Sequence, residues 1–76
     1  MVESSRIDHA HHNAFANIAL EETVVFDQVV EKTIKLLESK GILDETLIIV
    51  TSDHSHTMTL PGYPLRGSDI KGKRLR

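Results

Sequence analysis

The residues best able to do chemistry in this chain are its five histidines, which fall in two short clusters that each contain an aspartate. The first cluster spans residues 8–12 and reads Asp-His-Ala-His-His, and the second spans residues 53–56 and reads Asp-His-Ser-His. Imidazole nitrogen and carboxylate oxygen together suit zinc and similar divalent ions. The two clusters flank one structural unit, and together they predict a metal site that holds one ion or more.

Sequence spacing indicates which of these side chains can share an ion. Asp8 and His12 are four residues apart at an expected helix start, which puts both on one face. Asp53 and His54 are adjacent at an expected strand end, and Glu3 is within reach of the first cluster if the lead-in is extended. Each feature also has an ordinary structural explanation: a helix N-cap for the first aspartate, a turn for the second pair, and a solvated surface for the glutamate.

Composition limits what such a site can be. The chain has 76 residues, 39% of them hydrophobic, with no Trp and no Cys, so any core is thin and neither a disulfide nor a thiolate ligand is available. Chains below roughly 80 residues usually need a disulfide, a metal or a partner for stability. A zinc ion here would therefore have to be held by nitrogen and oxygen ligands.

Charge and hydropathy give few further signals. The formal net charge of −2 indicates no nucleic-acid partner, and residues 71–76 form a basic run that is either a solvated tail or a phosphate-binding patch. No apolar stretch approaches the roughly 20 residues that span a bilayer. No signal peptide is visible after Met1, an observation that carries weight only if Met1 is the true start.

The elements that must position the two clusters follow from the apolar pattern. Residues 13–40 carry an apolar stripe at steps of three and four, which predicts one long helix that ends before Gly41. Residues 46–51, Thr-Leu-Ile-Ile-Val-Thr, are typical of a strand buried on both faces in a parallel sheet. Residues 52–70 are expected to form a loop beyond the carboxyl end of that strand, where open α/β folds bind ligands.

The predicted fold class is therefore α/β, because a helix, a short turn and a buried strand form half of a βαβ unit. A strand buried on both faces needs hydrogen-bonded neighbours on both sides, and each unpaired buried amide costs on the order of 1–3 kcal/mol. The segment is thus expected to belong to a larger sheet, as a piece of a larger protein.

Three ordered motifs resemble the alkaline phosphatase family. Residues 3–12, Glu-Ser-Ser-Arg-Ile-Asp-His-Ala-His-His, closely resemble that family's E-G-G-R-I-D-H-G-H-H motif. Residues 50–56, Val-Thr-Ser-Asp-His-Ser-His, resemble its V-T-A-D-H-S-H motif, and residues 62–67 match the G-Y-P-L-R-G loop of its animal members. The resemblance covers about residues 2–70 and implies a fragment of the family's three-layer α/β/α fold.

The implied organisation is one partial alkaline phosphatase domain over the whole chain. Its expected parts are a metal-binding lead-in at 1–12, the helix at 13–40, the strand at 46–51, a metal-binding loop at 52–70 and a divergent tail at 71–76.

The resemblance also implies a reaction and a set of metal ligands. The family hydrolyses phosphate monoesters with two zinc ions and one magnesium ion. Five ligands carry over by their place in the motifs: Asp8 and His12 to the first zinc, Asp53 and His54 to the second, and Glu3 to the magnesium. His56 would hydrogen-bond a zinc-ligating carboxylate from the outer layer, whereas His9 and His11 are expected to be structural.

Some features of the family pattern have no counterpart here. No residue matches the serine nucleophile, which lies upstream of the glutamate motif in the family, so the chain alone is expected not to turn over substrate. Ser4, Ser5 and Ala10 stand where the motif has glycines, and each would be strained by roughly 1 kcal/mol or more if its backbone needs a positive φ.

The parent enzyme implied by the resemblance is a homodimer that is lipid-anchored at the cell surface or secreted, and this location is not expected to be encoded in the chain itself. Two other interpretations stay open at this point. One is a non-catalytic truncated paralogue. The other is a small zinc-binding module whose ligands would be Asp8, His12, Asp53 and His54.

Overall fold

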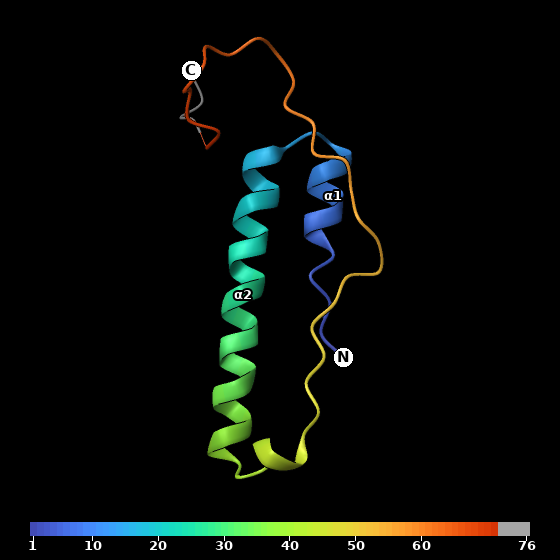
Figure 1. The fold of residues 1–76 in the computed structure, drawn as a ribbon, viewed down its shortest axis with the longest axis vertical. Helices are drawn as coiled ribbons and strands as arrows, with labels where there is room; N and C mark the ends of the chain where they lie inside the picture. Colours follow the sequence, from blue (N-terminus) through green and yellow to red (C-terminus); the bar gives the residue numbers. More distant parts are fainter. Residues whose placement is uncertain (72–76) are drawn as a thin grey trace.

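The computed structural model of the chain describes residues 1–71, which form two α-helices and one short 3-10 helix. Helix α1 spans Arg6–His12, helix α2 spans Ala16–Ser39, and the 3-10 helix η1 spans Leu43–Glu45. The two α-helices lie antiparallel to one another, and after η1 the chain runs back along α1 (Figure 1). The molecule is elongated, with extents of 51 × 24 × 20 Å.

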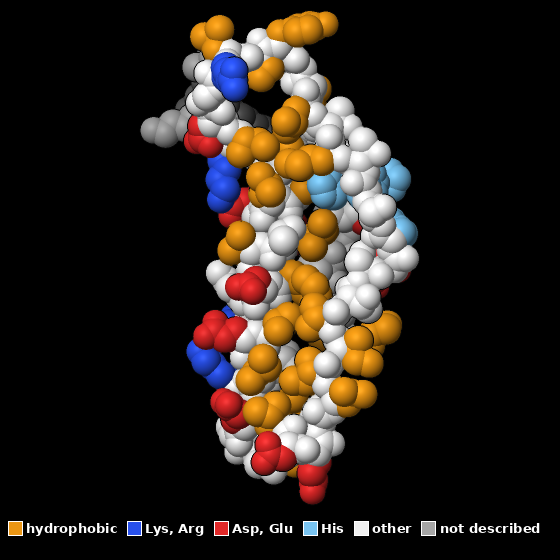
Figure 2. Space-filling view, in the orientation of Figure 1, with side chains coloured by type: hydrophobic (Ala, Val, Ile, Leu, Met, Phe, Trp, Pro, Cys, Tyr) orange, Lys and Arg blue, Asp and Glu red, His pale blue; other side chains and the backbone are white. Residues whose placement is uncertain are grey.

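The contact between α1 and α2 is built from small side chains. Within residues 1–71 the buried positions are Ala10 of α1 and Ala16 and Ala19 of α2. Part of the predicted apolar stripe stays exposed, including Phe15 and Val25, which are 50% and 49% exposed, while Phe26, Val29 and Ile34 are half-buried. Figure 2 shows this apolar surface as orange side chains gathered along the face between α2 and the returning chain. Within the described residues, full burial is therefore limited to alanines of α1 and of the first turn of α2.

A break at Asn13–Phe15 separates the two helices, so the helix predicted at 13–40 begins three residues later than expected, at Ala16. The amide of Phe15 donates to the carbonyl of Ala10 at 2.9 Å, and the amide of Ala14 donates to the carbonyl of His11 at 3.0 Å. This is the double hydrogen-bond pattern of a Schellman helix end. It requires a left-handed residue, which here is Ala14 with φ 56°, at a cost of about 1–2 kcal/mol.

The same Schellman hydrogen-bond pattern ends α2, and there the left-handed residue is a glycine. Gly41 has φ 68°, its amide donates to the carbonyl of Glu38, and the amide of Ile42 donates to the carbonyl of Leu37. Glycine has no Cβ, so it takes this conformation without the strain that alanine has. Glycine at this position therefore signals the end of α2 in the sequence, whereas the alanine that ends α1 gives no such signal.

The predicted α/β fold class, with its strand at 46–51 and its three-layer architecture, is wrong: the described residues contain no strand, and the chain is helical. Thr46 does have extended dihedrals, φ −113° and ψ 120°. An extended segment becomes a strand only when its amides and carbonyls pair with a neighbour, and residues 1–71 supply none. Leu47 and Ile49 are accordingly 84% and 73% exposed rather than buried.

We call residues 46–57 the return segment. In Figure 1 it passes from η1 alongside the N-terminal lead-in and α1, which brings the second histidine cluster back to the first. Beyond it, Lys71 Nζ lies 2.8 Å from Glu21 Oε1 of α2, and this hydrogen bond and the Glu21 charge raise the pKa of Lys71. The rest of the basic run predicted at 71–76 lies outside the described residues.

Candidate metal centre

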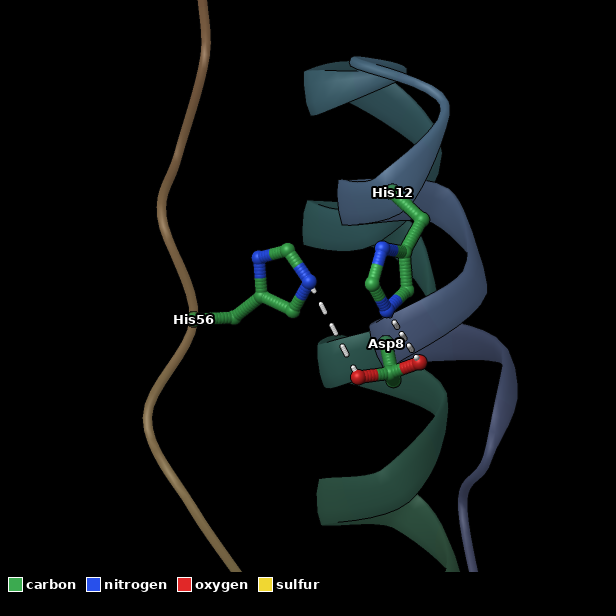
Figure 3. Close-up of side chains that lie close together, drawn as sticks. All are labelled: Asp8, His12 and His56. Atoms are coloured by element: carbon green, nitrogen blue, oxygen red, sulfur yellow. Dashed lines mark ion pairs between the residues drawn. The ribbon is translucent and has the colours of Figure 1, made fainter.

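Helix α1 supplies the first half of the centre. Asp8 and His12 are one helical turn apart, and His12 Nε2 lies 3.3 Å from Asp8 Oδ2 (Figure 3). The spacing of four residues places both side chains on the same helix face. Asp8 is partly shielded, with 35% of its side chain exposed, while 66% of the His12 side chain is exposed. These two predicted ligands therefore lie together as a direct result of local helix geometry.

The return segment supplies the second half. His54 Nε2 and His56 Nε2 lie 3.7 Å and 3.8 Å from the other carboxylate oxygen of Asp8, Oδ1. In Figure 3, His56 points from the returning chain toward α1 and faces the same carboxylate as His12. Asp53 lies beside this group, with its Oδ2 3.4 Å from His54 Nε2. One carboxylate thus joins three imidazoles that come from both histidine clusters.

Backbone contacts set the orientation of the two return-segment imidazoles. His54 Nδ1 lies 2.9 Å from the carbonyl of Ser55, and His56 Nδ1 lies 2.9 Å from the carbonyl of Thr57. A carbonyl oxygen only accepts hydrogen bonds, so Nδ1 is the donor in each ring, and in the neutral ring Nε2 keeps a free lone pair. Both Nε2 atoms lie within 3.8 Å of Asp8 Oδ1. This is the arrangement that a histidine ligand adopts when its other nitrogen is held by the protein.

Charge and ring packing shape the rest of the centre. The hydrogen bond to the Ser55 carbonyl, and then the negative charge of Asp53, raise the pKa of His54. The His56 ring stacks on His11 with ring centres 5.2 Å apart and meets the His12 ring edge-on at 4.5 Å. Asp8 Oδ1 is shielded from solvent and has no hydrogen-bond partner among the described residues. A shielded carboxylate oxygen without a donor is a strong acceptor for a cation.

The other residues singled out in the sequence lie elsewhere. Glu3 is exposed, and with its neighbours in residues 2–6 it lines a hollow whose other wall includes Val25, Phe26 and Val29 of α2. It does not belong to the Asp8 group. Asp53 contacts that group through His54. The set whose donor atoms all lie within 4.8 Å of one another is Asp8, His12 and His56.

His56 is the member of that set for which the sequence predicted only an outer role. The spacing of two residues between His54 and His56 indicated that both could share a side of the chain. It did not indicate which of the two would approach His12, because the return segment has no regular secondary structure that would fix its side-chain directions.

Comparison with known proteins assigns the chain to a class. The family model for alkaline phosphatases matches residues 1–75. A membrane-bound alkaline phosphatase of Bombyx mori is 45% identical over 71 residues, and alkaline phosphatase 4 of Drosophila melanogaster is 46% identical over 72 residues, which cover 93% and 95% of this chain. The tissue-nonspecific alkaline phosphatase of Mus musculus is 44% identical over 72 residues, or 95% of this chain. The chain belongs to the alkaline phosphatase family.

The chain spans only a small part of these relatives. The matched residues make up 12%, 11% and 13% of the Bombyx, Drosophila and mouse proteins, respectively. No solved structure gives a significant match. Neither α-helix in the described part of the chain combines the length and the apolar character that crossing a membrane requires.

Proposed function

We propose that this chain is a metal-binding segment of a phosphate-monoester hydrolase of the alkaline phosphatase type, and that it supplies metal ligands without the nucleophile. The single observation that supports this proposal is the convergence of both histidine clusters on Asp8, with three Nε2 atoms within 3.8 Å of its carboxylate. Two segments more than 40 residues apart in sequence thus present donor groups to one point. Membership of the alkaline phosphatase family supports a role in phosphate-ester hydrolysis for these converging groups.

The donor chemistry fits the metals that the resemblance implies. In the proposed assignment, Asp8 and His12 hold one zinc, and Asp53 and His54 hold the other. Zinc accepts such mixed nitrogen and oxygen ligands, whereas magnesium prefers oxygen, which suits Glu3. The shielded Asp8 Oδ1, which has no hydrogen-bond donor among residues 1–71, is the feature of the described residues that best fits a cation.

The proposed roles of the chain's own residues are to bind and to orient. When bound, divalent ions in such a site polarise a phosphoryl oxygen and lower the pKa of a coordinated hydroxyl. Asp8 would hold its ion from the rigid face of α1. His54 would present Nε2 because its Nδ1 is held by the Ser55 carbonyl. The serine that attacks phosphorus would come from outside these 76 residues.

Substrate, assembly and location are proposed at the level of the larger enzyme. Phosphate monoesters are the proposed substrates, because the chain's relatives are named as phosphatases. A homodimer, lipid-anchored at the cell surface or secreted, is the proposed assembly. The Bombyx relative is itself named as membrane-bound.

A chimera tests this proposal in the setting of a whole enzyme. The matching segment of the mouse tissue-nonspecific enzyme would be replaced by residues 1–71 of this chain, and zinc content and hydrolysis of a chromogenic phosphate ester would be measured. We expect a metal-loaded, active chimera that loses both properties with His12→Ala or His54→Ala and keeps them with His9→Ala, since His9 lies outside the Asp8 group.

A folded chimera that binds no zinc would contradict the proposal. The second measurement uses the 76-residue chain alone with zinc and magnesium at alkaline pH. We expect no turnover of the phosphate ester, and turnover would contradict the proposed absence of a nucleophile.

A further inference from the structure

We propose that residues 46–51 of this chain pair with the same residues of a second copy, antiparallel and with Ile48 opposite Ile48. We call residues 46–51 the pairing stretch. The inference goes beyond the proposed function, because it concerns how two copies of the chain associate. Among the described residues of one chain the pairing stretch has no strand partner, and the second copy supplies one.

The backbone of the pairing stretch offers hydrogen-bonding groups that the rest of the described chain does not use. Thr46 is tied to η1: its amide donates to the carbonyl of Leu43 at 3.0 Å, and its hydroxyl donates to the carbonyl of Ile42 at 2.7 Å. After Thr46, residues 47–51 make no backbone–backbone hydrogen bond within residues 1–71. A row of unpaired amides and carbonyls is a template for pairing with another chain.

The side chains of the pairing stretch alternate in exposure, as they would along a strand. Leu47 and Ile49 are 84% and 73% exposed, whereas Ile48 and Val50 are 38% and 56% exposed. Successive side chains of extended backbone point to opposite sides, so one side faces solvent and the other is turned toward the rest of the chain. Figure 2 shows hydrophobic side chains standing out from the lower part of the returning chain.

The composition of the pairing stretch suits association with an identical segment. Five of its six residues are β-branched, and it contains no charged residue, no proline and no glycine. β-Branched side chains favour paired strands. Short segments of this composition pair with copies of themselves when they are exposed. A second copy is therefore a partner that the sequence itself specifies.

Acidic residues on both sides of the pairing stretch restrict the alignment. Asp44 and Glu45 precede it, and Asp53 follows it closely. In a parallel pair in register, each of these carboxylates would lie beside its own copy, and like charges directly opposite each other are destabilising. An antiparallel pair centred on Ile49 would set Glu45 opposite Asp53, which is again unfavourable.

The antiparallel alignment centred on Ile48 avoids these repulsions. It sets Glu45 opposite Thr51, and it sets Leu47 opposite Ile49 at two symmetric places. Apolar side chains directly opposite one another stabilise paired strands. Each copy presents the same residues to the other, so the interface is isologous and closes with two copies.

The small core of the chain is consistent with such a partner. Full burial among the described residues is limited to three alanines. Chains below roughly 80 residues usually need a disulfide, a metal or a partner for stability, and this chain has no cysteine. Pairing would cover part of the apolar surface that one copy leaves exposed.

The alignment is tested by disulfide formation, since the natural chain has no cysteine that would interfere. Ile48→Cys and Thr51→Cys variants of the full 76-residue chain would be oxidised in a glutathione buffer without added metal. Directly opposite residues lie about 4.5–5.5 Å apart between Cα atoms, a distance that a disulfide spans. Two copies of residue 51 would be roughly 20 Å apart in this alignment. We expect the Ile48→Cys dimer to form at least about tenfold faster.

A matched pair of lysine variants tests whether the pairing stretch drives association. Sedimentation equilibrium over micromolar to millimolar concentrations is expected to show a monomer and a dimer of the unmodified chain. Ile49→Lys should raise the dissociation constant at least about tenfold, because the substitution enters the interface twice. Val24→Lys places the same charge on α2, at a side chain that is 48% exposed, and should change it by less than about twofold. Circular dichroism would show that both variants keep their helices.

Three results would overturn the inference. The chain could stay monomeric at millimolar concentration. Equal disulfide rates for the two cysteine variants would indicate a parallel pair or random collision. Growth into fibres, with no dimer that accumulates, would contradict an interface that closes with two copies. None of these results depends on the metal content or activity measured in the chimera.

Discussion

The two halves of the candidate centre use the same donor groups but are held in different ways. Asp8 and His12 lie four residues apart on α1, and the hydrogen-bonded helix backbone fixes their relative position. On the return segment, His54 and His56 are each held by a contact to the next residue's carbonyl. Ala10 of α1 is 5% exposed, whereas Leu47 of the return segment is 84% exposed. Local helix geometry therefore positions the donor groups of α1. The donor groups of the return segment are positioned by the path that the whole segment takes past α1.

The largest effect is expected from removing the Asp8 carboxylate, which the donors of both halves face. Asp8→Asn keeps the shape of the side chain but removes the charge that faces three imidazoles. We expect zinc affinity to fall by roughly a hundredfold or more, since a neutral amide is a poor zinc ligand. Competition with a chelating dye measures the loss. The control is Asp27→Asn on the exposed surface of α2, and equal affinities for the two variants would contradict the shared role of Asp8.

The next prediction compares the zinc affinity lost on removing a donor from α1 with that lost on removing a donor from the return segment. We expect His12→Ala to weaken zinc binding by roughly tenfold more than His54→Ala, because a donor on a rigid helix loses less freedom on binding. The same titration checks both variants. A larger loss for His54→Ala would contradict the greater rigidity expected of the donor on α1.

The sequence predicted the structure around α1 and α2 better in some places than in others, and the reasons are physical. The end of α2 was predictable because Gly41 suits the left-handed conformation that the helix end requires. The break between α1 and α2 was not, because Ala14 adopts that conformation against its own preference. The approach of Asp8 to His12 followed from their spacing alone.

The failed strand shows what a sequence pattern leaves out. Residues 46–51 have the β-branched and apolar character of a buried strand, but strand formation depends on a partner backbone that these residues do not specify. The contact of His56 with α1 depends on the path of the whole return segment. Local pattern therefore predicted the α1 half of the centre, whereas a place for His56 beside a carboxylate was expected only from the resemblance to the family.

A third prediction concerns the stability of the helical half. Ala14→Gly removes left-handed strain at the end of α1, and we expect unfolding free energy to rise by about 0.5–1 kcal/mol after the entropy cost of glycine. Gly41→Ala should lower it by about 1 kcal/mol, since it introduces that strain at the end of α2. Urea unfolding followed by far-ultraviolet circular dichroism measures both. A destabilised Ala14→Gly variant would contradict the strain at this position.

The smallest effect is expected in the return segment. Ile49 is 73% exposed, so Ile49→Thr should change the free energy of unfolding by less than about 0.5 kcal/mol. The same unfolding experiment applies. A loss above about 2 kcal/mol would mean that this side chain is buried in solution, as large losses come from buried positions.

The most direct test of the centre is whether the two histidine clusters meet in solution. The ring centres of His56 and His12 are 4.5 Å apart, so their ring protons are expected to give nuclear Overhauser effects in the 76-residue chain. Effects between α1 and α2 in the same spectrum would show that the helices are in place. Cross-peaks from His56 to His12 are the predicted result. Their absence while the helix contacts persist would contradict convergence on Asp8.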